Sequence, residues 1–292
     1  MKRLIIGTAN FDNDYGILNN KLSKKEIEKV LKFCFNNRIK TIDSAPTYGK
    51  AEKIIGNFLQ NHDCNGVDLI SKTPLIFKDD EIYEKINKSI ETTLNNMKLE
   101  KIHTLLIHSV SNFLEVNPST FLESLLKLKS EGKIKKIGIS IYEEKEFNAI
   151  AKFFIPDVVQ LPISIIDQRF LSNKFLTTLK KKKCEIHARS IFFQGLLFLD
   201  SDKIPKNLLA IKGPILLIDR FCKQYAVTRL NLILNFICSI KEIDAFVVGV
   251  KSKGNLVEVF KELCTIKLKR YKIPYNNFFL NNPKILDARN WS

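Results

Sequence analysis

The sequence predicts a single (β/α)8 barrel of the α/β class that spans residues 1–292. Short apolar runs alternate with amphipathic helical patterns from one end of the chain to the other, which is typical of a parallel α/β architecture. The length suits one such barrel, and no stretch rich in Pro, Gly and Ser divides the chain. A doubly wound open sheet is the rival arrangement, but eight consecutive βα units favour closure.

The order of the expected elements follows directly from the periodicity. Strands are expected at residues 4–10, 41–45, 67–73, 102–110, 134–142, 158–163, 184–190 and 245–250. Helices are expected at residues 23–37, 51–61, 81–97, 118–131, 143–153, 173–182, 215–239 and 255–263. Ser23 and Glu26 predict a capping box at the first helix, and Gly132 predicts the end of another. The tail after Lys269 has little periodicity and is expected to pack over the barrel.

Composition narrows the class of protein. The hydrophobic fraction of 45% is that of a globular chain, and no apolar stretch reaches the ~18 residues of a membrane span. The N-terminus is basic and then apolar, but the apolar run stops after three residues without a cleavage site, so we expect a cytoplasmic protein that does not bind a membrane. The six cysteines are scattered and no His-x-His pair occurs, so no metal site is predicted.

The net charge of +16 comes mostly from lysines spread along the helices, with one run at residues 180–183. Nucleic-acid-binding proteins concentrate charge together with aromatic residues on one face, and that concentration is missing here. We therefore interpret the lysines as solvated helix faces and expect no nucleic-acid partner. A positive field would still attract a phosphorylated cofactor or a nucleotide-linked substrate.

Polar residues at the carboxyl ends of the strands define a candidate site, because barrels carry their function there. Asp43, Lys72 and His108 end strands two, three and four, and Tyr48 follows strand two. Taken singly, each residue has an ordinary explanation: a cap, a surface lysine, a core histidine or loop packing. Their occurrence together on three successive strands favours a catalytic set.

This set suits proton transfer to an oxygen that gains negative charge. A tyrosine has an unperturbed pKa near ~10 and is a weak acid at neutral pH. A neighbouring ammonium stabilises the phenolate, and a carboxylate keeps that ammonium charged. A neutral imidazole can orient a carbonyl by a hydrogen bond. A ketone or aldehyde that accepts a hydride requires such a proton.

The turn after strand eight is a candidate phosphate site. Residues 249–255 read GVKSKGN and lead into a helix, so that backbone N–H groups and the helix dipole would face an anion. An ordinary βα turn with exposed lysines explains this segment equally well. The sequence contains no G-x-G-x-x-G, Walker A or G-x-S-x-G motif.

Residues 41–56, TIDSAPTYGKAEKIIG, resemble the signature of the aldo-keto reductase family. The resemblance covers nearly the whole chain and includes segments 7–9 (GTA), 138–140 (GIS) and 189–195 (RSIFFQG). It implies an NAD(P)-dependent oxidoreductase that reduces an aldehyde or ketone. It also implies that Tyr48 donates the proton, that Lys72 and Asp43 support it, and that His108 orients the substrate.

The resemblance further implies a nicotinamide cofactor, with NADPH preferred and NADH as the second choice. Ser140 and Gln160 would hold the nicotinamide carboxamide, and the turn 249–255 would hold the adenosine phosphates, with Lys251 and Lys253 favouring the 2′-phosphate. The cofactor residues implied in this way are Ser140, Gln160, Arg189, Ser190, Gly249, Lys251, Ser252 and Asn255.

Three positions depart from the family pattern. Ile141 stands where Asn is common, so the resemblance does not extend to the carboxamide contact that this Asn makes. Arg189 stands where many members have an aromatic residue that stacks on the nicotinamide, although a guanidinium can also stack on a flat ring. Val259 replaces an Asn that often contacts the adenine.

Several segments resemble the short aldo-keto reductases found in bacterial polysaccharide-synthesis clusters. They are residues 159–162 (VQLP), 167–169 (DQR), 186–197 (IHARSIFFQGLL) and 287–291 (DARNW). The implied substrate is a small-molecule carbonyl compound, such as a sugar or nucleotide-sugar. Two alternatives stay open: a non-catalytic NADPH-binding regulatory subunit, and a lyase or aldolase with Lys72 as a Schiff base. The sequence names neither the substrate nor the oligomeric state.

Overall fold

The chain forms a closed barrel of parallel strands, and a computed structural model describes residues 2–14, 16, 21–62, 64, 66–77, 81–265 and 273–291. Each strand pairs with its neighbours in sequence order, and β8 closes the barrel by pairing with β1. The predicted fold class is therefore confirmed. The strands are β1 (Arg3–Gly7), β2 (Thr41–Asp43), β3 (Asp68–Lys72), β4 (Ile102–Ile107), β5 (Ile134–Ser140), β6 (Val158–Pro162), β7 (Glu185–Arg189) and β8 (Ala245–Gly249).

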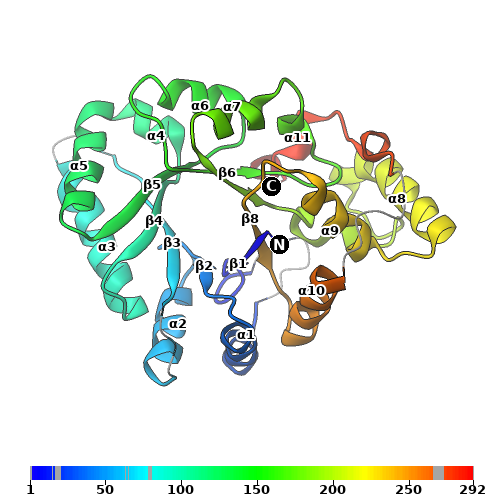
Figure 1. Cartoon of the computed structure of the whole chain (residues 1–292), viewed down its shortest axis with the longest axis horizontal. Coiled ribbons are helices and arrows are strands. Elements are labelled where there is room, and N and C mark those ends of the chain that lie inside the picture. The colour runs from blue at the N-terminus through cyan, green and yellow to red at the C-terminus, as the bar shows by residue number, and fades with distance from the viewer. Residues whose placement is uncertain are drawn as a thin grey trace.

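Helices surround the strands on the outside (Figure 1). Along the chain they are α1 (Lys24–Asn36), α2 (Ala51–Gln60), α3 (Ile82–Met97), α4 (Val110–Glu115), α5 (Pro118–Ser130), α6 (Glu144–Ile150), α7 (Phe175–Lys181), α8 (Lys212–Tyr225), α9 (Arg229–Ser239), α10 (Lys253–Thr265) and α11 (Pro283–Leu286). Short 3-10 helices lie at Arg169–Leu171, Phe193–Phe198, Lys206–Ile211, Tyr275–Phe278 and Ala288–Asn290. None of the helices in the described part of the chain is long and apolar enough to cross a membrane.

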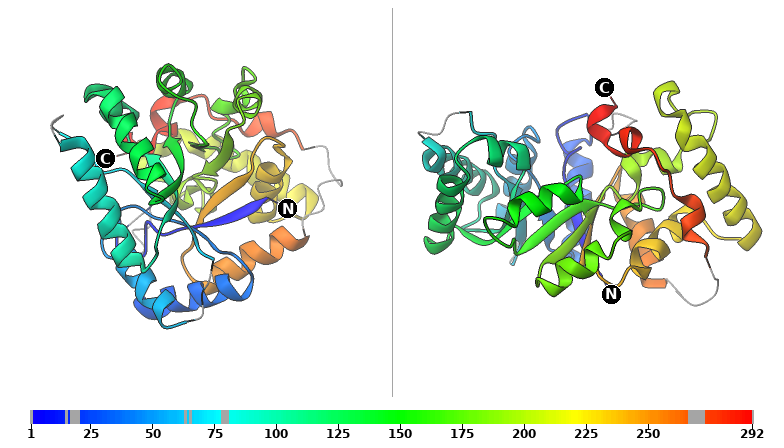
Figure 2. Two further views of the ribbon diagram at one scale, coloured as in Figure 1. Left: turned by 60° about the vertical axis from the view of Figure 1, so that its left-hand side comes forward. Right: turned by 90° about the horizontal axis from the view of Figure 1, so that it is seen from above.

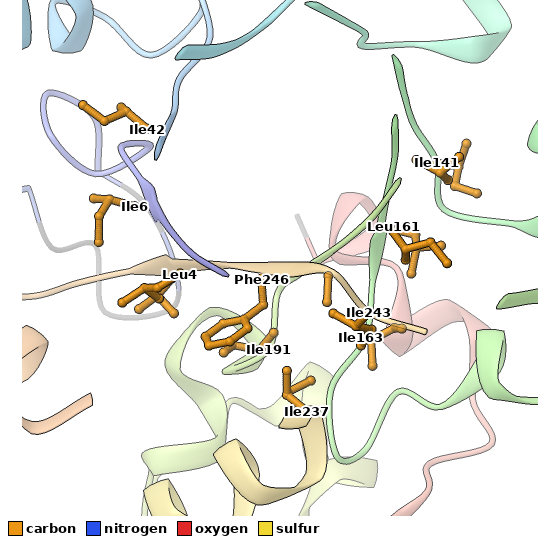
Figure 3. Close-up of a cluster of buried hydrophobic side chains, with 14 of the residues drawn as sticks. Leu4, Ile6, Ile42, Ile141, Leu161, Ile163, Ile191, Ile237, Ile243 and Phe246 are labelled. Carbon is orange, nitrogen blue, oxygen red and sulfur yellow. The ribbon is translucent and has the colours of Figure 1, made fainter. Parts of the chain in front are cut away.

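The strands bury apolar side chains on both faces, as the sequence predicts. Successive side chains in a strand point to opposite sides of the sheet. One set, which includes Ile5, Leu106 and Val158, forms a separate small cluster inside the barrel. The other set packs against the helices: Phe246 of β8 points toward Ile191 and toward Ile237 of α9 (Figure 3).

Charged residues close the amino-terminal end of the barrel. Arg3 of β1 and Glu185 of β7 form an ion pair, and Lys136 of β5 donates to Glu185 at 2.6 Å. His187 is 2% exposed and lies 3.0 Å from a Glu185 oxygen. Burial and then the nearby Arg3 charge lower the pKa of His187 to about 3, so its ring is neutral at pH 7.

The first helix is capped only in part as expected. Ser23 accepts a hydrogen bond from the Glu26 N–H at 3.2 Å. The Glu26 carboxylate does not return to Ser23, so the predicted capping box is wrong in that half. Instead the Glu26 carboxylate accepts a hydrogen bond from the backbone N–H of Lys253 at 2.7 Å. This bond joins α1 to the start of α10.

Two predicted elements are divided in the structure. The helix expected at 215–239 is two helices, because Ala226 adopts φ +50° and ends α8; Thr228 then caps α9 through the Asn231 N–H at 3.0 Å. The strand expected at 102–110 ends at Ile107, and α4 begins at Val110. Ser109 accepts from the Asn112 N–H at 3.2 Å and caps that helix.

The C-terminal segment packs over the barrel, as predicted for the part that is described; residues 270–272 lie outside it. The Leu280 N–H donates to the Ile166 carbonyl at 2.9 Å, and the Gln168 amide donates to the Tyr275 carbonyl at 2.8 Å. In the right-hand view of Figure 2 this segment, coloured orange-red to red, runs past the yellow helices to the point marked C. The segment brings its last residues to the mouth of the barrel.

Gly56 in α2 permits a close approach of α3, which yields a test of packing. A Cβ at Gly56 would lie 1.8 Å from the Asn96 carbonyl oxygen. We expect Gly56→Ala to destabilise the fold by about 1–3 kcal/mol, because the helices must separate. Gly213→Ala is the control, since a Cβ at Gly213 would meet nothing within 4 Å. The added methyl group lowers the conformational entropy of the unfolded chain, so this variant should not be destabilised. Thermal denaturation that ranks the two variants equally would contradict this account.

Candidate active site

A cavity of about 1220 Å³ opens at the carboxyl ends of the strands. The four residues singled out from the sequence, Asp43, Tyr48, Lys72 and His108, all line it. They come from three successive strands and the loop after β2. The structure therefore brings the whole predicted set into one mouth.

A buried ion pair lies at the floor of this cavity. The Lys72 ammonium donates to an Asp43 carboxylate oxygen at 2.7 Å and to the Ser44 carbonyl at 2.9 Å. The two side chains of the pair are 4% and 6% exposed. Burial alone lowers the pKa of Lys72, but attraction to Asp43 and Tyr48 outweighs burial and raises that pKa above its ordinary value. Lys72 is thus a fixed positive charge.

Tyr48 is held beside this charge by a turn. The Tyr48 N–H donates to the Ala45 carbonyl at 3.0 Å. Gly49 follows with φ +60°, a conformation that favours glycine, and its turn leads directly into α2. The Lys72 ammonium lies 5.0 Å from the centre of the Tyr48 ring. The phenol ring is therefore beside a buried cation.

His108 follows β4 and is partly buried in the same mouth. Its backbone N–H donates to the Thr73 hydroxyl at 3.2 Å, which fixes the strand end. Burial, then the positive charges of Lys72 and Arg189, lower the pKa of His108 to about 4. The ring is neutral at pH 7, so one of its nitrogens donates a hydrogen bond and the other accepts one.

Gln160 has a contact that the sequence did not indicate. Its amide nitrogen donates to the second Asp43 oxygen at 2.7 Å, across the barrel from β6 to β2. Ser140, which pairs in register with Gln160, lines the same cavity. Only the closed barrel reveals the Gln160–Asp43 contact, because the two residues are far apart in the sequence and lie on strands that are not neighbours.

Arg189 leans toward the end of β5. It donates to the Ile141 carbonyl at 3.2 Å, and its guanidinium carbon lies 4.1 Å from the centre of the Tyr142 ring. Ser190 adjoins it in the cavity wall with φ +58°. Ile141 itself is buried in the core and is absent from the cavity wall.

The turn after β8 lines the far end of the cavity. Gly249, Lys251 and Asn255 face it, and a Cβ on Gly249 would meet nothing within 4 Å. Ser252 accepts from the Asn255 N–H at 3.1 Å and caps α10. Burial lowers the pKa of Lys251. One expected anion donor, the N–H of Lys253, is already taken by Glu26.

Other lining residues were missed from the sequence. Tyr142, Arg289 and Lys261 all line the cavity. Tyr142 ends the strand expected at 134–142 and Arg289 lies in the segment 287–291, but neither was assigned a role at the site. Val259, by contrast, is buried in the core. No group of three or more His, Cys, Asp or Glu side chains within the described ranges could hold a metal ion.

Comparison with known proteins agrees with the barrel and its signature segment. The model of the aldo/keto reductase family matches residues 3–275. The chain is 26% identical over 195 residues to an NADH-specific methylglyoxal reductase of Escherichia coli, with 60% of this chain and 59% of that protein covered. It is 23% identical over 193 residues to a 6-dehydroglucose reductase of Agrobacterium fabrum, with coverage of 60% and 64%.

A solved structure, the glycerol dehydrogenase from Gluconobacter oxydans, superposes with a TM-score of 0.71 at 17% identity. That superposition covers 94% of this chain and 88% of the other, and supports the barrel fold. Because the family model spans nearly the whole sequence, the chain belongs to the aldo/keto reductase family.

The lowered pKa of His108 gives a pH prediction. In the unfolded chain the imidazole titrates near 6.5, whereas in the fold it titrates near 4. Between these values the unfolded state binds more protons, so stability falls as pH decreases from about 6.5 to 4. We expect His108→Gln to show a shallower loss of unfolding free energy across that window in urea denaturation. An NMR titration of the His108 ring with a midpoint near 6.5 would contradict the prediction.

Proposed function

We propose, from membership of the aldo/keto reductase family, that the protein is a nicotinamide-dependent oxidoreductase that reduces an aldehyde or ketone, with Tyr48 as the proton donor. The observation that carries this proposal is the buried Lys72–Asp43 ion pair, because the Lys72 ammonium lies 5.0 Å from the centre of the Tyr48 ring. A fixed cation beside a phenol is suited to supply a proton to an oxygen that becomes negative.

Each residue of the site has one task in this proposal. The neutral His108 ring donates a hydrogen bond to the substrate carbonyl and sets its orientation. A nicotinamide nucleotide held by Ser140, Gln160 and the neighbouring wall would supply the hydride that the carbonyl carbon accepts. The Tyr48 proton passes to the carbonyl oxygen, which gives an alcohol, and Lys72 stabilises the phenolate that remains. The phenolate regains its proton from solvent.

The cavity has features that fit a nicotinamide nucleotide. Ser140 and Gln160 provide polar side chains near the tetrad, and Arg189 and Ser190 form the adjoining wall. The open space over Gly249 and the Lys251 ammonium in the cavity wall suit phosphate oxygens. Lys251, Ser252 and Asn255 complete the residues that we assign to the cofactor. We propose NADPH as the preferred form and NADH as the second choice, although one relative is named as NADH-specific.

The proposed substrate is a small carbonyl compound, and a sugar or nucleotide-sugar carbonyl is the class that we favour. One relative is named as a 6-dehydroglucose reductase, which supports an oxidised sugar. A Schiff base on Lys72 is disfavoured, because its raised pKa and its bond to Asp43 keep the nitrogen protonated. A regulatory subunit without turnover is the remaining alternative.

Removal of one oxygen atom tests the proton donor. We expect Tyr48→Phe to lower kcat by about 10²–10⁴-fold while the affinity for NADPH stays nearly the same, since the hydroxyl acts only when the proton moves. Turnover is measured by NADPH oxidation and affinity by fluorescence titration. Tyr83→Phe is the matched control, because that hydroxyl bonds Glu131 on the outer surface. Wild-type kcat in Tyr48→Phe would contradict the assignment.

Lys251 tests the cofactor preference. We expect Lys251→Ala to lower the affinity for NADPH by about 5–10-fold and the affinity for NADH much less. The reason is that the charge which is lost would face the 2′-phosphate that only NADPH carries. Fluorescence titration with both nucleotides measures the ratio. Lys181→Ala on α7 is the control for general charge loss. Equal losses of affinity for both nucleotides would remove the case for an NADPH preference.

A further inference from the structure

Two guanidinium groups gather on one aromatic ring at the mouth of the cavity. The guanidinium carbon of Arg189 lies 4.1 Å from the centre of the Tyr142 ring, and that of Arg289 lies 3.8 Å from the same centre. All three residues line the cavity that holds the tetrad. Both guanidiniums thus bring positive charge and N–H donors to one part of the cavity wall, where they attract an anion within reach of both.

Arg289 is positioned by the C-terminal segment rather than by chance. Asp287 accepts from its Nε at 2.9 Å and from a terminal nitrogen at 2.6 Å. Asp287 is itself buried. Arg169 donates to the Leu286 carbonyl at 3.2 Å, and the Trp291 indole donates to the Ile285 carbonyl at 2.7 Å. These contacts aim the guanidinium over Tyr142 while leaving Arg289 half-exposed to the cavity.

Arg189 has no carboxylate partner at ion-pair distance among the described residues. Its acceptors are the Ile141 carbonyl at 3.2 Å and, weakly, the Ser190 hydroxyl at 3.5 Å. A half-buried guanidinium with five N–H donors is therefore left with spare donors in the cavity. Its charge reaches His108, where it contributes to the lowered pKa of the imidazole.

Glu146 also lines this cavity, and its carboxylate is already engaged by backbone N–H groups. One of its oxygens accepts from the backbone N–H groups of Tyr142 and Glu143, the latter at 2.9 Å. These bonds hold Glu146 at the start of α6, so Asp287 is the carboxylate that pairs with Arg289, whereas Arg189 has none at ion-pair distance among the described residues.

We propose that Arg189 and Arg289, supported on Tyr142, form a subsite for an acidic group of the substrate, so that the enzyme reduces carbonyl compounds that carry a carboxylate or a phosphate. The inference rests on the proposed reductase function and specifies its substrate. Arginine binds both groups through paired N–H donors. Arg189 also belongs to the wall that we assign to the nicotinamide, and its charge reaches His108, so the acidic group of the substrate is placed beside the reacting carbonyl. The residues assigned to the cofactor phosphates follow β8.

Matched substrates test the subsite. Succinic semialdehyde and butanal have the same chain length, and only the first carries a carboxylate. Glyceraldehyde 3-phosphate and glyceraldehyde form a second pair, which differs by a phosphate. We expect kcat/KM for an acidic member to exceed that for its neutral partner. Arg289→Gln should lower that ratio by ~10- to 100-fold, as expected for a lost charge-assisted pair, and Arg289→Lys should lower it less. Arg220→Gln, an exposed arginine on α8, should keep the wild-type ratio.

A binding measurement separates this inference from the reductase function. Calorimetric titration with succinate and with neutral succinamide requires no turnover, and Trp291, the single tryptophan, gives a fluorescence signal beside Arg289. Selective succinate binding that Arg289→Gln removes supports the subsite even if no carbonyl is reduced, in which case the reductase proposal alone fails. Reduction of acidic and neutral aldehydes with equal kcat/KM, or no selective binding of succinate, overturns the subsite.

Discussion

The buried ion pair of Lys72 and Asp43 is the interaction on which the site depends. Removing two charges from water is costly, and their mutual attraction compensates only when the remaining hydrogen-bonding capacity is also satisfied. Here Ser44 supplies a carbonyl to the ammonium and Gln160 supplies an amide to the carboxylate. The partners come from β2, β3 and β6, so the pair is satisfied only in a closed barrel. The site and the fold are therefore coupled: the barrel places the partners, and the pair constrains the barrel.

The glycines of the signature segment extend this coupling to the helices. Gly49 turns the chain after Tyr48, and Gly56 lets α2 approach α3. Glu52 lies on the same helix, is buried, and accepts from the Thr93 hydroxyl of α3 at 3.0 Å. Burial raises the pKa of Glu52. The loop that carries the phenol is thus tied on one side to the ion pair and on the other to a tight helix contact.

The sequence predicts the features that depend on local periodicity and on position along a strand. Apolar runs locate all eight strands to within a few residues, and the strand ends identify Asp43, Lys72 and His108 as neighbours. The sequence does not predict the break at Ala226, since the apolar pattern continues through it and only the left-handed backbone there ends α8. Long-range contacts were also missed for a physical reason: the Gln160–Asp43 bond joins residues 117 positions apart, and no local pattern encodes that pairing.

The position of Gln160 reconciles its observed contact with its proposed role at the cofactor. A glutamine side chain has two N–H donors and one carbonyl acceptor. The bond to Asp43 uses one donor, so the second donor and the carbonyl oxygen can still bind a carboxamide. A nicotinamide held there would also be linked, through Gln160 and Asp43, to Lys72 and the phenol beside it. Gln160, which we assign to the nicotinamide, and Lys72, which supports Tyr48, therefore share one hydrogen-bonded network through Asp43. This network would keep the nicotinamide and the phenol in a constant relative position.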